Sequence, residues 1–137
     1  DISTSNKGQM SALFSDFIPE YNRPTQRVLT VDANTLDEYI KTHAVPTVIK
    51  MDVENSEYLV LGGAKKLLAE HSPIIAMEVM DTPEHIERTR KALVILKNAG
   101  YCPFSITPEG TLEPADLQNL GSLGEYNIVV FKKLTDI

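Results

Sequence analysis

The sequence predicts an α/β domain with a mostly parallel sheet. Apolar runs at 48–53 and 74–79 are nearly continuous, as in strands that are buried on both faces. Helical segments at about 56–71 and 82–99 follow the two runs, and this strand–helix alternation is typical of parallel strands joined by right-handed crossovers. The chain has 137 residues and is 42% apolar, which suits one ordinary globular domain over its whole length.

The N-terminal part, residues 1–31, is predicted to be an irregular lead-in with one short strand. Residues 3–8 are small and polar and indicate a loop. Pro19 and Pro24 bracket a further irregular stretch, and the short strand is expected at 27–31.

Cap signals delimit the next elements. Thr35-Leu36-Asp37-Glu38 matches a capping box, which predicts a helix ending near His43. Asn55 or Ser56 can cap the helix after the first apolar run, and Gly62-Gly63 is expected to interrupt it.

Similar signals delimit the second half of the chain. Thr82-Pro83 supplies an N-cap followed by proline at the first helical position, and Gly100 suits the left-handed position after a helix end. The remaining predicted elements are a strand at 102–107, a turn at 108–110, a helical turn at 114–120 and a last strand at 127–131.

Charge and cysteine content exclude several classes of protein. The net charge of −6 argues against nucleic acid or an anionic membrane surface as the main partner. Cys102 is the single cysteine, so an internal disulfide framework is excluded and a reducing, cytoplasmic location is expected. No apolar run approaches the roughly 20 residues of a membrane span.

Charged side chains gather where the predicted strands end. Lys50, Asp52 and Glu54 share one face of their strand because strand side chains alternate. Ligands of open α/β sheets bind beyond the carboxyl ends of the strands. A buried lysine needs a partner, and Glu78 in the adjacent strand is the predicted one. The alternative is a structural ion pair that only fixes strand register.

Other roles for these acidic residues are less well matched by the sequence. Helix capping accounts for Glu57 but less well for Asp52, which is still inside the predicted strand. Asp52, Glu54 and Glu78 offer oxygen ligands of the kind that Mg²⁺ or Ca²⁺ prefers, but no dedicated loop accompanies them. The three histidines lack metal-ligand spacing, so no metal site is predicted.

The sequence of the same strand and the residues after it resembles a known family motif. The run Val-Ile-Lys-Met-Asp-Val-Glu-Asn-Ser-Glu at 48–57, followed by Val-Leu-Gly-Gly-Ala at 60–64, resembles the hallmark of the FkbM-type methyltransferases. That hallmark reads Leu-Ile-Lys-Ile-Asp-Val-Glu-Gly-Ala-Glu, then Val-Leu-x-Gly-Ala. Weaker matches in the same order extend the resemblance over most of 28–131, and they are Thr35–Glu38, Pro73–Glu78, Gly100-Tyr101 and Asn127-Ile128.

The resemblance implies a fold and an activity. It implies a three-layer, Rossmann-like methyltransferase fold, of which 1–137 would be the carboxyl-terminal portion, with an antiparallel last strand. It also implies S-adenosylmethionine as methyl donor and O-methylation of a hydroxyl on a sugar, lipid or secondary metabolite. The alternative is a non-catalytic α/β interaction or ligand-binding module whose carboxylates are structural.

The resemblance also suggests roles for single residues. Asp52 is the first candidate for the base or substrate anchor, and Lys50 is the second. Glu54 and Glu78 would bind the acceptor. Asn127 begins the antiparallel strand and would therefore lie at the same edge, although an Asn that merely starts a strand is the alternative.

Two departures from the family pattern affect these expectations. Asn55 stands where the family usually has Gly, and Asn tolerates a left-handed conformation better than other non-Gly residues. The Gly-rich turn that holds the methyl donor is not found, so the chain is expected to be an N-terminally incomplete domain that binds the donor poorly. The strand at 48–53 would then have a free edge, which predicts self-association or cover by residues 1–31.

Overall fold

The computed structural model describes residues 2–5, 8–11, 31–117 and 127–134. The chain divides into two units, residues 1–33 and 34–137. In the first unit, β1 (Ile2–Ser5) pairs antiparallel with β2 (Gly8–Ser11). The predicted loop at 3–8 is therefore wrong, because polar side chains do not prevent backbone pairing across a short connection. Most of the strand predicted at 27–31 lies outside the described residues.

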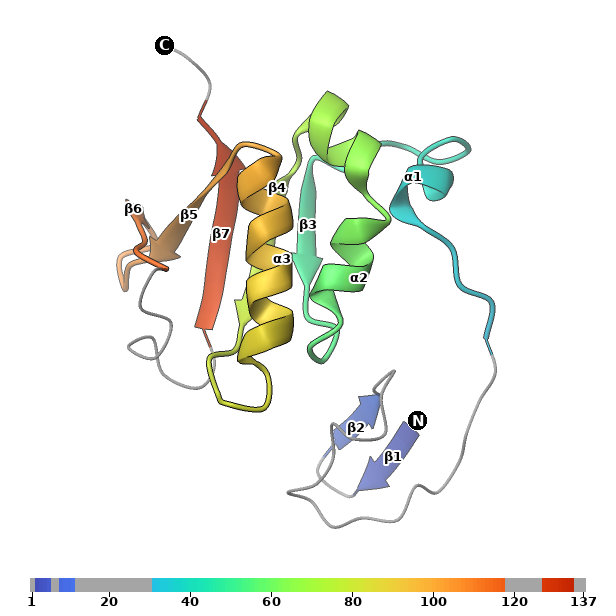
Figure 1. Cartoon of the computed structure of the whole chain (residues 1–137), viewed down its shortest axis with the longest axis horizontal. Coiled ribbons are helices and arrows are strands. Elements are labelled where there is room, and N and C mark those ends of the chain that lie inside the picture. The colour runs from blue at the N-terminus through green and yellow to red at the C-terminus, as the bar shows by residue number, and fades with distance from the viewer. Residues whose placement is uncertain (1, 6–7, 12–30, 118–126, 135–137) are drawn as a thin grey trace. The chain divides into compact units, whose positions relative to one another are not determined.

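The second unit contains a five-stranded sheet in the order β3-β4-β7-β5-β6 (Figure 1). Its strands are β3 (Val48–Met51), β4 (Ile74–Val79), β5 (Tyr101–Ile106), β6 (Leu112–Pro114) and β7 (Asn127–Lys133). Only β3 and β4 pair in parallel among the described strands. The antiparallel last strand is confirmed, but the mostly parallel sheet is corrected to a mixed one. The reason is that β7 inserts between β4 and β5 and runs against both.

Within the described residues, four helical segments accompany the sheet: α1 (Leu36–Tyr39), α2 (Glu57–Gly62), the π-helix η2 (Leu67–His71) and α3 (Ile86–Asn98). Figure 1 shows α2 and α3 on the same side of the sheet. The core between helices and sheet is apolar, and its fully buried members include Met51, Leu61, Leu67, Ile75, Met77, Val79 and Leu96. The predicted interruption at Gly62-Gly63 and the strand at 74–79 are confirmed.

The other face of the sheet carries exposed apolar side chains. Val48 and Ile74 are register partners on neighbouring strands and are 59% and 40% exposed. Because β3 is at the end of the strand order, it has a described neighbour on one side only. The expectation of a strand at 48–53 buried on both faces is therefore wrong, since the strand ends at Met51 and lies at the edge.

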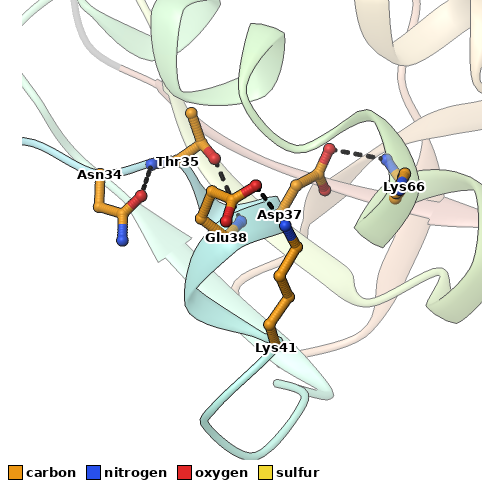
Figure 2. Close-up of polar contacts among 6 residues, drawn as sticks. All are labelled: Asn34, Thr35, Asp37, Glu38, Lys41 and Lys66. Carbon is orange, nitrogen blue, oxygen red and sulfur yellow. Dashed lines mark hydrogen bonds and ion pairs between the residues drawn. The ribbon is translucent and has the colours of Figure 1, made fainter.

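Several predicted boundaries shift by a few residues. Thr35 caps α1 by accepting the Glu38 N–H at 3.1 Å, but the Glu38 carboxylate pairs with Lys41 rather than completing the capping box (Figure 2). The helix ends at Tyr39, and looser turns follow it to His43. The backbone carbonyl of Thr82 accepts two N–H groups in a preceding turn, so α3 begins only at Ile86.

The second half shows similar shifts. Gly100 has a φ of +83°, as its predicted left-handed position requires. The predicted turn at 108–110 is present and closes with the Gly110 N–H donating to the Thr107 carbonyl at 2.9 Å. It leads into β6, which occupies the start of the helical turn predicted at 114–120, and residues 118–120 lie outside the described part.

A clasp joins α1 to the segment between α2 and η2. The two carboxylate oxygens of Asp37 accept the backbone N–H groups of Lys66 and Leu67, each at 3.0 Å. The Asp37 N–H donates to the Gly63 carbonyl at 3.0 Å. Figure 2 shows Asp37 pointing at the backbone of Lys66. Thr35–Glu38 and the Gly-Gly segment, both noted in the sequence, therefore meet in space as a structural joint.

Candidate functional site

The carboxyl ends of β3 and β4 lie side by side. Their register pairs Lys50 with Ala76 and Met51 with Met77. Asp52 follows β3 directly, so continuation of this register brings it level with Glu78. Met51 and Met77 face the core, and alternation therefore turns Lys50 and Glu78 to the opposite face. The predicted gathering of polar residues at this edge is thus built into the strand pairing.

Lys50 pairs with Asp52 rather than with Glu78. The Lys50 Nζ lies 2.8 Å from the Asp52 carboxylate, and the lysine side chain is 68% exposed. The hydrogen bond with Asp52 and the charge of that carboxylate raise the pKa of Lys50, while Glu78 adds only a smaller effect. The predicted Lys50–Glu78 pair is therefore corrected. An exposed lysine at a sheet edge reaches the nearer carboxylate two residues along its own chain.

The turn after β3 has an unusual backbone. Glu54 and Asn55 have φ values of 53° and 62°, so two consecutive non-glycine residues are left-handed. The structure confirms that Asn55 takes this conformation in the family's usual glycine position. The same conformation at Glu54 was not predicted, because glutamate has no special tolerance for it. Burial, then the charges of Asp52 and Glu57, raise the pKa of Glu54.

Glu57 is a member of this site that sequence reasoning assigned to helix capping. It is buried, and its Oε1 accepts the Val53 N–H at 3.2 Å. Burial raises the pKa of Glu57, whereas hydrogen bonds from backbone N–H groups oppose that shift. The only signal in the sequence was a glutamate at the first position of a helix, which is common.

The pKa of Glu78 is strongly shifted by its surroundings. Burial, followed by the negative charges of Asp52, Glu54 and Glu57, raises the pKa of Glu78 to about 7, and Lys50 opposes the shift. The strand register brings Asp52 level with Glu78, and Glu54 and Glu57 follow Asp52 within the next five residues. We call Asp52, Glu54, Glu57 and Glu78 the carboxylate cluster.

The sequence as a whole matches the family model described as the methyltransferase FkbM domain, over residues 2–103. The chain belongs to the FkbM methyltransferase domain family. The suspected family is thereby confirmed, and the match contains both strands that carry the carboxylate cluster. Comparison with curated proteins and with solved structures found no match.

Asn127 lies at the same edge of the FkbM domain. It begins β7 and pairs with Val79, the last residue of β4. The backbone placement predicted for it is therefore confirmed, whereas its side chain lies outside the described ones. Its role as a substrate ligand stays a prediction.

Three buried polar atoms at this edge have no hydrogen-bond partner among the described residues. They are the Asn55 Nδ2, the Ser56 Oγ and one carboxylate oxygen of Asp81. Asn55 and Ser56 lie within the turn after β3, and Asp81 lies two residues beyond β4. Ser56 is the N-cap of α2 by position, but its side chain makes no capping hydrogen bond.

The described residues of the FkbM domain do not supply a methyl-donor cradle. The turns after β3 and β4, residues 52–56 and 80–85, contain no glycine. Gly62 and Gly63 end α2 and do not follow a strand. We therefore assign no residue to S-adenosylmethionine and derive no step through it.

Two features are absent from the described part of the chain. No group of three or more His, Cys, Asp or Glu side chains there is arranged to hold a metal ion. No helix in that part is long and apolar enough to cross a membrane.

Proposed function

We propose that this FkbM domain serves transfer of a methyl group from S-adenosylmethionine to a hydroxyl of a small molecule, such as a sugar, lipid or secondary metabolite. The carboxylate cluster at the carboxyl ends of β3 and β4 supports the proposal. Carboxylates hydrogen-bond hydroxyl groups, and a group that titrates near neutral pH suits proton transfer. Glu78 has such a pKa, at about 7.

The contacts of the cluster suggest how its members would divide the work. Asp52 is 42% exposed at the end of β3 and is held by Lys50, so it is our first candidate to anchor the acceptor hydroxyl or to accept its proton. The raised pKa of Lys50 favours its ammonium form, which suits an anchor better than a base. Glu54, Glu78 and Asn127 would bind the remaining hydroxyls, with Glu78 as the second proton acceptor.

Binding of candidate acceptors can be followed by NMR. Neutral polyols and sugars titrated into ¹⁵N-labelled protein should shift the amide signals of 52–56 and 78–81. Asp52→Asn should weaken this response at least several-fold. Glu109→Gln, in the β5–β6 turn, is the control and should leave it unchanged. Shifts that persist in Asp52→Asn, or that occur only elsewhere, would contradict the assignment.

We further propose that this chain alone binds S-adenosylmethionine poorly. The absence of glycine from the turns after β3 and β4 supports this view. Calorimetry should then give a dissociation constant for S-adenosylmethionine weaker than about 1 mM. Micromolar binding would overturn this part of the proposal and leave the acceptor site standing.

Among the described strands β3 has a neighbour on one side only, and this position suggests self-association. An unpaired edge strand offers its backbone groups to another strand, and Val48 on β3 is largely exposed. We expect sedimentation velocity to show concentration-dependent dimerisation. A clean monomer at high concentration would remove this expectation. We also propose that the protein acts in the cytoplasm.

A further inference from the structure

Glu57 is a buried glutamate at the start of α2, and its carboxylate contacts the backbone of the turn that precedes the helix. The residue is 7% exposed and begins α2. Its Oε1 accepts the Val53 N–H at 3.2 Å. The backbone N–H of Asn55 and its own N–H also interact with the carboxylate. The side chain therefore reaches back over four residues and gathers the donors of the turn.

The backbone of this turn needs such support. Glu54 and Asn55 are both left-handed, and non-glycine residues keep that conformation only when their surroundings fix it. The side chain of Asn55 is buried, and its Nδ2 has no hydrogen-bond partner in the described part. Among the described side chains, the Glu57 carboxylate closes the turn by accepting the Val53 N–H.

We propose that Glu57 is the positioning residue of the site. Its carboxylate holds residues 52–56 in the conformation that presents Asp52 and Glu54 beside Glu78. The inference rests on the proposed function only in that this presentation serves acceptor binding. Glu57 itself is too buried to act on the acceptor, so it works through the residues it holds.

An ordinary helix-capping role makes the opposite prediction for two conservative variants. Glu57→Asp keeps the negative charge at the start of α2 but shortens the side chain by one methylene, so it no longer reaches the Val53 N–H. Glu57→Gln keeps an oxygen at the same reach but removes the charge. Positioning requires the oxygen and its reach, whereas interaction with the helix dipole requires the charge.

The experiment records the amide signals of Val53 and Asn55 and the carboxyl titration of Glu78 by NMR. Glu57→Gln should keep both amide shifts and lower the Glu78 midpoint only slightly, because Glu57 has the smallest effect among the three carboxylates that raise the pKa of Glu78. Glu57→Asp should move both amide shifts and bring the Glu78 midpoint clearly closer to 4.5, as Asp52 and Glu54 move away.

Controls and outcomes separate this role from stability and from the proposed function. Glu70→Gln, at an exposed position of η2, removes one charge and should change neither readout. The Gly100 and Tyr101 amide signals report whether each variant is folded. Loss of the Val53 and Asn55 shifts in Glu57→Gln, or their retention in Glu57→Asp, overturns the inference. Neither readout involves methyl transfer, so failure of the proposed function leaves this result independent.

Discussion

The ammonium of Lys50 lies 2.8 Å from the carboxylate of Asp52, on the outermost of the described strands of the sheet. Both groups act on Glu78 with opposite signs, Asp52 raising its pKa and Lys50 lowering it. Asp52→Asn should therefore lower the Glu78 titration midpoint from about 7, and Lys50→Met should raise it. Carboxyl ¹³C titrations of the two variants measure both shifts. Shifts of the same sign would mean that the pair does not flank Glu78.

Glu78 should make the stability of the protein depend on pH. Its pKa is raised from 4.5 to about 7 in the folded state, so the unfolded chain binds fewer protons between these values. Stability therefore falls as the pH rises through this window, and the loss is complete above the folded-state pKa. The melting temperature of Glu78→Gln should drop less between pH 5 and pH 8 than that of the unmodified protein. Equal drops would show that Glu78 titrates normally.

Asn55 tests the backbone of the turn. At a φ of 62°, alanine is strained whereas glycine is not. Asn55→Gly and Asn55→Ala both empty the buried side-chain position, so the difference between them isolates the backbone effect. The glycine variant should be more stable by about 1 kcal/mol. Urea denaturation measures the difference, and equal midpoints would argue against a left-handed residue here.

Asp37 should contribute to stability through the clasp to Lys66 and Leu67. Asp37→Ala leaves two backbone N–H groups without their acceptor, at a cost of about 1–2 kcal/mol. Its neighbour supplies a matched control. Glu38→Gln disrupts only the exposed pair with Lys41 and should change the free energy of unfolding by less than about 0.5 kcal/mol. Similar losses in the two variants would contradict the clasp.

Gly62 and Gly63 should respond in opposite directions to the same substitution. A Cβ on Gly63 would lie 3.0 Å from the Cβ and Cγ2 of Thr35, whereas one on Gly62 would meet nothing within 4 Å. Gly63→Ala should destabilise by about 1–3 kcal/mol. Gly62→Ala should stabilise α2 by up to about 1 kcal/mol. Thermal melts of the two single variants provide the comparison.

Local signals predicted the elements well. The break at Gly62-Gly63, the strand at 74–79 and the left-handed Gly100 follow from residue types whose conformational preferences are strong. The edge position of β3, predicted from the family resemblance, agrees with the order of the described strands, but the apolar run gave no sign that the outer face of β3 is exposed. Lys50 was consequently expected to be buried and proved exposed.

The candidate site was predicted in part for a related reason. Alternation and strand register place Lys50, Asp52 and Glu78 at one edge. Glu57 was assigned to helix capping instead, because a glutamate that begins a helix has that ordinary explanation. Its contact with Val53 depends on the left-handed pair at 54–55, which only the folded backbone shows.

The fit between Thr35 and Gly63 has an evolutionary consequence. The two positions are 28 residues apart, yet the side chain of one occupies the space that a side chain on the other would need. Substitution at either position therefore changes which residues selection tolerates at the other. In related chains of the same fold, we expect a larger residue at the position of Gly63 to appear only with a smaller or displaced one at the position of Thr35.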